Sequence, residues 1–449
     1  MARILFALHQ FFPRFYTGTE TLTLEVAKEF QARGHCVSIV CVEPVTPDFP
    51  GSTEPELSHT LYDGIPVWRI STGPETDVLN RLVHESNDAR IVPFIEEVLL
   101  HEQPDIVHIF HLMHLTLSFV TTVKKVGIPL FFTTTDFWLL CPTYQLLKYN
   151  QELCSRPASL SCFKCLMSLY MRGSASLQKK IGFHFPRLAW LFSPAARSCQ
   201  RILKARIRHN HRIIEMIDGV FWSNAFLKNI FLANNYSAKN SRIISFPVPQ
   251  KASNLFELPL AQQSDVLRVA FIGTLNPSKG AQVVIKAMTA LDSSIPVQLN
   301  IWGASMIPKF EDELRSFAQS DSRITFCGAF PQERFSEVLK DIDVLVIPSL
   351  WYENTPLTAL SALAARRVLI VSDLGGLSSL VDHGNNGYLF PPGDYVALSR
   401  ILERLSRDKS ELTTCVENIA PPGKITNYVD DLILCYEECT QRLKKTSSY

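Results

Sequence analysis

The segment from Pro348 to Asp394 constrains the fold of this 449-residue chain most strongly, because strand and helix patterns alternate along it at short intervals. The apolar run DVLVIPS is typical of a buried parallel strand. After it, apolar residues recur at helical spacing from Leu357 to Ala364. Pro356 suits the first helical position, with Asn354 or Thr355 as the cap. A second apolar run, VLIVSD, follows, and the alternation predicts an α/β protein with a parallel sheet.

The same segment carries groups that suit a sugar and a diphosphate. Glu353 lies in the turn before the predicted helix, where its carboxylate can accept hydrogen bonds from sugar hydroxyls. The helix start, Asn354 to Leu357, offers free N–H groups and a positive dipole end to phosphate. Gly375 and Gly376 permit a close backbone approach in the next turn.

These motifs resemble the large family of retaining GT-B glycosyltransferases related to glycogen synthase, known as group 1 or family four. The family signature is a pair of glutamates eight positions apart, followed by EAxAxGxPVV and GGxxE. Glu353 fills the first glutamate position, whereas Ser361 occupies the second. Arg366 stands at the glycine, Val368 at the proline and Ser379 at the last glutamate. In the family the second glutamate holds the nucleotide ribose, so Ser361 indicates an altered donor pocket.

The resemblance covers nearly the whole chain and implies an α/β, GT-B fold with two Rossmann-like βαβ domains facing a central cleft. The expected acceptor-side domain spans residues 1–247, with a basic, cysteine-containing insertion at 141–215. The expected nucleotide-sugar-binding domain spans 266–425, and a last helix, 426–449, crosses back to the first domain. The implied activity is transfer of a sugar from a nucleoside-diphosphate donor to a hydroxyl with retention and without a catalytic metal.

Two glycine-containing loops are candidates for contact with the donor phosphates. The loop GTLNPSKG places Lys279 after a predicted strand, within reach of a phosphate. Thr274 stands where the family often has an arginine. Gly18, in FYTGTE, matches the family's glycine loop at a predicted helix N-terminus. The alternatives are a solvated turn lysine and an ordinary helix-start turn.

Asp136 is the candidate acceptor-side carboxylate. It lies in TTTDFWLLCP, after a predicted strand, where open α/β sheets bind ligands. The family often reads HDFW there, and Thr135 takes the place of the histidine. Asp136 could orient or deprotonate an acceptor hydroxyl, or could only cap a turn. With Glu353 it is one of two predicted catalytic residues.

The predicted donor-binding set combines these loops with the helix start that follows Glu353. It comprises Gly18, Thr274, Lys279, Asn354, Thr355, Pro356, Leu357 and Ser361.

Four cysteines, Cys141, Cys154, Cys162 and Cys165, form a C-x12-C-x7-C-x2-C array. Four thiolates with one CxxC pair can close a tetrahedral zinc site, so a structural zinc is one interpretation. Unlinked thiols are the other. The eleven cysteines of the chain are mostly isolated in apolar contexts, which is typical of reduced thiols in a cytoplasm.

The stretch from Leu153 to Ile214 has no Asp or Glu and holds twelve Lys and Arg, although the whole chain has a net charge of only +1. Aromatic residues are interleaved with these cations, as in segments that lie in an anionic headgroup layer. A solvated helix face and nucleic-acid binding are the alternatives. We therefore expect a cytoplasmic protein, peripheral on the inner face of the membrane, because no run approaches the ~20 apolar residues that span a bilayer.

The expected acceptor is a lipid-linked glycan in bacterial surface polysaccharide assembly. The alternative is a catalytically weak or inactive homologue that binds a nucleotide sugar or acts as a scaffold. The sequence leaves the sugar, the nucleotide base and the linkage open.

Overall fold

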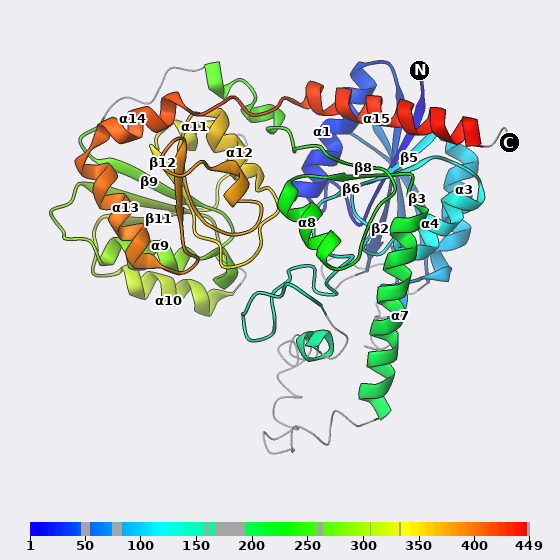
Figure 1. Cartoon of the computed structure of the whole chain (residues 1–449), viewed down its shortest axis with the longest axis horizontal. Helices are drawn as coiled ribbons and strands as arrows, with labels where there is room; N and C mark the ends of the chain where they lie inside the picture. The colour runs from blue at the N-terminus through cyan, green and yellow to red at the C-terminus, as the bar shows by residue number, and fades with distance from the viewer. Residues whose placement is uncertain are drawn as a thin grey trace. The chain divides into compact units, whose positions relative to one another are not determined.

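A computed structural model describes residues 1–45, 54–73, 83–157, 161–166, 194–257, 264–305, 307–331 and 334–446. The chain divides into two compact units (Figure 1). Unit 1 comprises Met1–Ser223, Lys228–Ile244 and Val429–Tyr449. Unit 2 comprises Asn224–Leu227 and Ser245–Tyr428.

Unit 1 is built on an eight-stranded sheet in the order β3-β4-β2-β1-β5-β6-β7-β8. Neighbouring strands are parallel except β3, which pairs antiparallel with β4 at the edge. The strands are β1 (Arg3–Leu8), β2 (Cys36–Pro44), β3 (Glu56–Tyr62), β4 (Ile65–Thr72), β5 (Ile106–Ile109), β6 (Leu130–Thr134), β7 (Gly219–Trp222) and β8 (Ser241–Ile243). The helices are α1 (Gly18–Ala32), α3 (Val92–Glu102), α4 (Thr116–Lys125), α7 (Pro194–Met216), α8 (Ala225–Ala233) and α15 (Ile425–Thr446), of which α8 belongs to unit 1 from Lys228 onward.

Burial explains why the short strands of unit 1 are nearly continuous apolar runs. In β1 every residue after Arg3 is buried, and all of β5, β6 and β7 is buried. Strands covered on both faces cannot alternate polar and apolar residues, as a half-exposed strand does. From β1 the chain passes to β2 on one side and later to β5 on the other, so the topological switch point lies between β1 and β5.

Unit 2 has a six-stranded, fully parallel sheet in the order β11-β10-β9-β12-β13-β14. This is the doubly wound order, with the switch point between β9 and β12. The strands are β9 (Leu267–Ile272), β10 (Val297–Trp302), β11 (Ile324–Gly328), β12 (Val344–Ile347), β13 (Val368–Ser372) and β14 (Gly387–Phe390). The helices are α9 (Ala281–Thr289), α10 (Pro308–Ala318), α11 (Phe335–Lys340), α12 (Leu357–Ala364), α13 (Tyr395–Arg407) and α14 (Lys409–Glu417).

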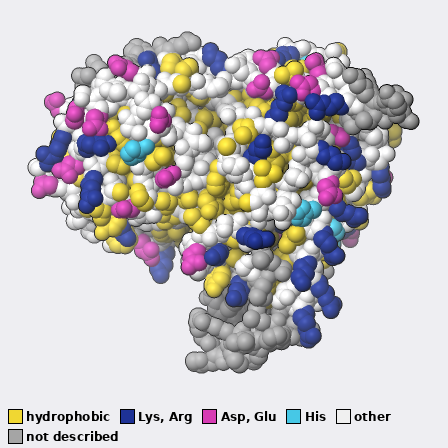
Figure 2. Space-filling view, in the orientation of Figure 1, with side chains coloured by type: hydrophobic (Ala, Val, Ile, Leu, Met, Phe, Trp, Pro, Cys, Tyr) yellow, Lys and Arg dark blue, Asp and Glu magenta, His cyan; other side chains and the backbone are white. Residues whose placement is uncertain are grey.

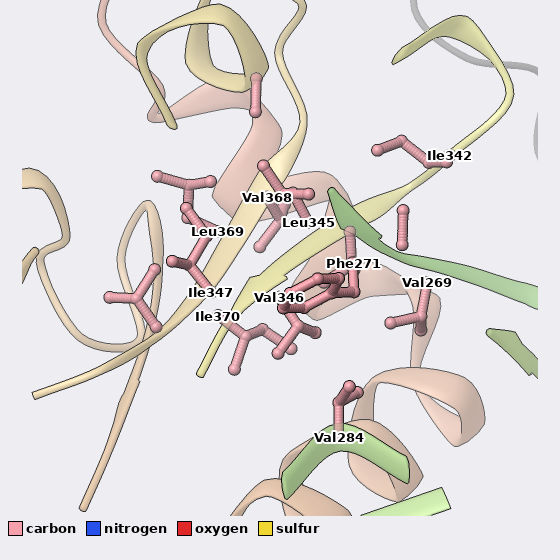
Figure 3. Close-up of a cluster of buried hydrophobic side chains, with 14 of the residues drawn as sticks. Val269, Phe271, Val284, Ile342, Leu345, Val346, Ile347, Val368, Leu369 and Ile370 are labelled. Carbon is pink, nitrogen blue, oxygen red and sulfur yellow. The ribbon is translucent and has the colours of Figure 1, made fainter. Parts of the chain in front are cut away.

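The core of unit 2 lies against the central strands of its sheet. Figure 3 shows side chains of β9, β12 and β13, among them Val269, Leu345 and Ile370, with Val284 of α9 beside them. These four residues are fully buried. Burying each such side chain contributes roughly 1.5–3 kcal/mol, so this cluster fixes the strand ends that carry the polar loops.

The last helix, α15, belongs to unit 1 from Val429 onward. Tyr436 on α15 is buried, and its hydroxyl contacts Nδ1 of the buried His108 on β5. Nε2 of His108 lies 2.9 Å from Oγ1 of Thr133 on β6. The last helix is thus tied into the interior of the first sheet, as the sequence-based fold predicted. Within the described residues, none of the helices is both long enough and apolar enough to cross a membrane.

Candidate active site

An ion pair spans the switch point of unit 2. Lys279 lies in the loop after β9, in a short 3-10 turn (Pro277–Lys279), and Glu353 follows β12. Nζ of Lys279 lies 2.7 Å from Oε1 of Glu353. The crevice at such a switch point is where open α/β sheets bind ligands. The two residues that the sequence singled out 74 positions apart are therefore brought together at this point of the sheet.

The Glu353 carboxylate is held by three donors on one oxygen. Besides Lys279, the hydroxyl of Ser349 donates to Oε1 at 2.8 Å and the indole Nε1–H of Trp351 donates at 2.7 Å. The Lys279 ammonium also lies 5.2 Å from the centre of the Trp351 ring. The Glu353 side chain is only 8% exposed. Among the described residues Oε2 has no hydrogen-bond partner, so the carboxylate is fixed by one oxygen and can accept bonds through the other.

Two glycines let the loops of this site pack on each other. Gly280 has φ +78°, and a Cβ there would lie 1.9 Å from the backbone oxygen of Pro348. A Cβ on Gly376 would lie 1.5 Å from the backbone oxygen of Asn354. The Gly376 N–H donates to the Glu353 carbonyl at 2.8 Å. Only glycine fits at these contacts, which hold the turn around Glu353 in place.

The helix start after Glu353 differs by one residue from the sequence prediction. Helix α12 begins at Leu357, and Pro356 is its N-cap in an extended conformation, with ψ 126°. Pro356 is therefore not the first helical residue, and the structure corrects that prediction. Asn354 and Thr355 do not cap the helix through their side chains; instead both accept hydrogen bonds from Nδ2 of Asn224, at 2.9 and 3.2 Å.

Two replaced family positions have their own local explanation. The buried Ser361 hydroxyl donates to the Leu357 carbonyl one turn earlier, at 2.8 Å. The Ser379 hydroxyl donates to the Gly376 carbonyl at 2.7 Å. Arg366, at the family's glycine position, has a left-handed backbone with φ 54°. The two serine hydroxyls thus satisfy hydrogen bonds inside unit 2.

Two further residues of the predicted donor-binding set, Thr274 and Gly18, are exposed. Thr274 follows β9 by two positions, in the same loop as Lys279. Gly18 is the first residue of α1 in unit 1, and Thr17 before it donates its hydroxyl to Glu20 at 2.5 Å. Their part in donor binding stays a prediction.

Asp136, the predicted acceptor-side carboxylate, lies two residues beyond β6 in unit 1. Its Oδ1 accepts the Trp138 N–H at 2.8 Å, so Asp136 does cap the turn. Its Oδ2 also lies 2.8 Å from Nε2 of His111, two residues beyond β5. His111 was not predicted from the sequence. The sequence does hold a signal for it: His111 and Asp136 each lie two positions after a buried, apolar strand.

The zinc site at the four cysteines stays a prediction. Among the described residues, no three His, Cys, Asp or Glu side chains are grouped so that they could hold a metal ion. Burial, followed by the neighbouring thiols, raises the pKa of Cys162 to about 12, and burial raises the pKa values of Cys154 and Cys165. Cys141 lies 3.2 Å from the Thr143 hydroxyl.

Two doubly wound sheets in one chain, each with polar residues at its switch point, define a protein of the GT-B class. Solved structures agree: HepE of Anabaena, in complex with UDP and glucose, has a TM-score of 0.62 at 16% identity, covering 97% of this chain and 100% of that one. The lipopolysaccharide outer core galactosyltransferase WaaB also has a TM-score of 0.62, at 15% identity, covering 97% and 99% of the two chains.

Residues 267–408 match the family model "Glycosyl transferases group 1", and residues 17–162 match "Glycosyl transferase 4-like domain". The chain belongs to this group 1 family of GT-B glycosyltransferases. The amylovoran biosynthesis glycosyltransferase AmsK of Erwinia amylovora is 29% identical over 160 residues, which are 33% of this chain and 38% of AmsK. The chain thus spans less than two fifths of this relative, and the same holds for an uncharacterized glycosyltransferase, MJ1607, of Methanocaldococcus jannaschii.

Proposed function

We propose that this protein is a retaining glycosyltransferase that binds a nucleoside-diphosphate sugar at the β9/β12 switch point. The observation that carries the proposal is the Lys279–Glu353 pair, 2.7 Å apart, in the unit that matches the group 1 family. The Lys279 ammonium would move partly away from Glu353 and bind the donor diphosphate. Glu353 would then bind hydroxyls of the donor sugar through Oε2, while Ser349 and Trp351 keep its position.

The leaving diphosphate needs positive charge around it as the sugar departs. Lys279 supplies a full charge, and the first turn of α12, which begins with the N–H of Leu357, adds a partial one. Preorganised donors of this kind stabilise developing negative charge without a metal ion. Gly18 and Thr274 are proposed as further phosphate contacts. Because the Ser361 hydroxyl is already bonded, we assign the larger share of donor affinity to Lys279 and Glu353.

The proposed acceptor is a hydroxyl of a lipid-linked glycan, bound on unit 1 next to Asp136. The names of AmsK and WaaB, which refer to amylovoran biosynthesis and to the lipopolysaccharide outer core, support a role in surface polysaccharide assembly. A test uses radiolabelled UDP-glucose, UDP-galactose and GDP-mannose with synthetic polyprenyl-diphosphate-linked N-acetylglucosamine. Transfer of label from one donor to the lipid, lost in Lys279→Ala, supports the proposal; nucleotide binding without transfer from any donor would favour a non-catalytic homologue.

The outer face of α7 supports contact with an anionic membrane. Five exposed cations follow one another at intervals of three or four residues, which places them on one helix face. They are Arg197, Arg201, Lys204, Arg208 and Arg212. None of the five forms an ion pair with any residue that the structure describes. Figure 2 shows Lys and Arg side chains gathered along the surface where α7 lies in Figure 1.

This stripe holds five of the cations of the basic stretch; Arg156, Lys164 and Arg206 are described as well. Arg172, Lys179, Lys180, Arg187 and the aromatic residues between 170 and 192 lie outside the described residues. Each cation near an anionic surface contributes about 1 kcal/mol, so five give roughly 5 kcal/mol before any ordering cost. We propose that α7 docks on the anionic inner face of a membrane.

The inner face of α7 connects this surface to the loop that carries Asp136. The buried Arg206 donates to the Trp138 carbonyl and stacks over the Trp138 ring at 4.9 Å. Asn210 donates to the Leu139 carbonyl at 2.7 Å. A membrane-docked α7 would therefore keep the Asp136 loop close to lipid headgroups, where a lipid-linked acceptor is found.

Sedimentation with vesicles tests the membrane contact. Wild type should sediment with phosphatidylglycerol vesicles, weakly with phosphatidylcholine vesicles, and less at high salt. Arg201→Glu/Arg208→Glu should lose this binding. The matched control, Lys309→Glu/Arg400→Glu, makes the same charge change at exposed cations of unit 2 and should keep it. Equal loss in both variants would point to net charge alone and contradict a docking surface on α7.

A further inference from the structure

A second polar cluster lies at the switch point of unit 1. His9 follows β1 directly, His111 follows β5 and Asp136 follows β6, which are three neighbouring strands of the sheet. Glu20 joins them from the first turn of α1. The rings of His9 and His111 are 4.0 Å apart between centroids, and Nε2 of His9 lies 3.6 Å from Oε1 of Glu20. The order in space is Glu20, His9, His111, Asp136.

Burial distinguishes the two ends of this cluster. Glu20 is 0% exposed, His111 5% and His9 7%, whereas the Asp136 side chain is 30% exposed. A ligand that approaches the cluster therefore meets the Asp136 carboxylate before the other three groups. Gln10 and Thr17 donate to the Glu20 carboxylate at 2.9 and 2.5 Å, which satisfies the buried end.

The hydrogen bonds of His111 define its tautomer. Its Nδ1 accepts the Met113 N–H at 3.0 Å, so Nδ1 carries no proton. The proton of the neutral ring then lies on Nε2, which donates to Oδ2 of Asp136 at 2.8 Å. Burial, with His111 and His114 adding to it, lowers the pKa of His9 well below its ordinary value. His9 is therefore a neutral packing surface for the His111 ring.

We infer that His111 is the positioning residue of the acceptor side: its Nε2–H fixes the Asp136 carboxylate so that Asp136 accepts the hydrogen bond of the incoming acceptor hydroxyl. The sequence lacks the histidine of the family's HD pair at Thr135, whose hydroxyl donates to the Phe110 carbonyl instead. An imidazole from the neighbouring strand end contacts Asp136 in this chain. The inference rests on the proposed function, because it assigns the acceptor to this carboxylate.

Two substitutions of His111 separate the hydrogen bond from packing. Both His111→Gln and His111→Phe remove the Nδ1 acceptor of the Met113 N–H, but only the glutamine amide can donate near the former Nε2 position. The variants are compared in a sugar-transfer assay. The sugar donor is the one among UDP-glucose, UDP-galactose and GDP-mannose that the wild type uses, and the acceptor is the synthetic polyprenyl-diphosphate-linked N-acetylglucosamine. His111→Phe should lower kcat/KM for the acceptor on the order of 100-fold, as small misplacements of a positioned group do.

His111→Gln should keep kcat/KM for the acceptor within about tenfold of the wild-type value. Neither substitution should change the affinity for the nucleotide. His101→Gln, at an exposed histidine of α3, is the control for a general effect of losing a histidine. In protein that already carries Asp136→Asn, adding His111→Phe should lower kcat/KM for the acceptor little further, because the two residues act as one unit. Equal loss in His111→Gln and His111→Phe at wild-type Tm would overturn the inference.

A spectroscopic measurement keeps the inference testable without turnover. In protein labelled with 15N-histidine, the His111 signals should show a protonated Nε2 and an unprotonated Nδ1, and Asp136→Asn should shift the Nε2–H resonance. A His111 ring protonated on Nδ1 would refute the inference whatever the assay shows. Failure of wild type to bind any nucleotide would instead refute the proposed function, so the two failures are distinguishable.

Discussion

Nζ of Lys279 and the indole Nε1 of Trp351 both lie 2.7 Å from the same oxygen of Glu353. The two donors differ in what they do when a donor sugar binds. The ammonium can move to a phosphate, because Lys279 has a long flexible side chain that is 32% exposed. The indole remains and keeps the carboxylate oriented.

Trp351→Phe should therefore separate binding of the sugar from binding of the nucleotide. It removes the Nε1–H and keeps an aromatic ring beside Lys279. We expect affinity for the nucleotide sugar to fall about tenfold, roughly 1.4 kcal/mol, with UDP affinity changed less than twofold. Calorimetric titration with both ligands measures this. An equal loss for UDP and for the nucleotide sugar would show that Glu353 does not select the sugar.

Gly376→Ala should disrupt the turn that carries Glu353. The new Cβ would lie 1.5 Å from the Asn354 carbonyl oxygen, so backbone must move. We expect a loss of unfolding free energy on the order of 3 kcal/mol, together with loss of donor binding. Gly423→Ala is the control, because a Cβ there meets nothing within 4 Å. Chemical denaturation compares them, and a wild-type curve for Gly376→Ala would contradict the described packing.

Much of this architecture could be predicted from the sequence. Buried strands are continuous apolar runs, so the strands that carry Lys279 and Glu353 were recognisable, and the α/β, GT-B prediction is confirmed. Side-chain partners across the sheet could not be predicted in the same way. His111 and Asp136 are 25 positions apart, and only the β5–β6 pairing brings them together. The cysteine spacing predicted a zinc site, and no group of His, Cys, Asp or Glu side chains suited to a metal ion is found among the described residues.

The backbone at Arg366 offers a test of local strain. Arg366 stands at the family's glycine position, and its backbone is left-handed, with φ 54°. The Arg366 guanidinium lies 5.2 Å from the Phe256 ring centre. Arg366→Gly and Arg366→Ala both lose this contact, and only glycine relieves the strained backbone. Arg366→Gly should be about 1 kcal/mol more stable than Arg366→Ala in urea denaturation; equal stabilities would argue against strain there.

Acid should destabilise unit 1 through His108. Burial lowers the pKa of His108 to about 3, whereas an unfolded histidine has a pKa of about 6.5. The unfolded state then binds the proton more readily, so unfolding becomes easier as pH falls below about 6.5, and the effect levels off below about 3. At pH 5 the loss is about 2 kcal/mol. Urea denaturation at pH 7.5 and 5 should show this loss in wild type and a smaller one in His108→Phe; parallel losses would contradict a buried neutral histidine.

The donor site is the central claim, and calorimetric titration with UDP, GDP and ADP tests it most directly. We predict micromolar binding of one nucleotide by wild type and a loss of at least about tenfold in Lys279→Ala, because a charge-assisted contact to phosphate contributes 1.5–3 kcal/mol. Lys286→Ala, on the following helix α9, serves as the control and should bind as wild type does. Binding that is indifferent to Lys279, or no binding of any of the three nucleotides, would contradict a donor site at the β9/β12 switch point.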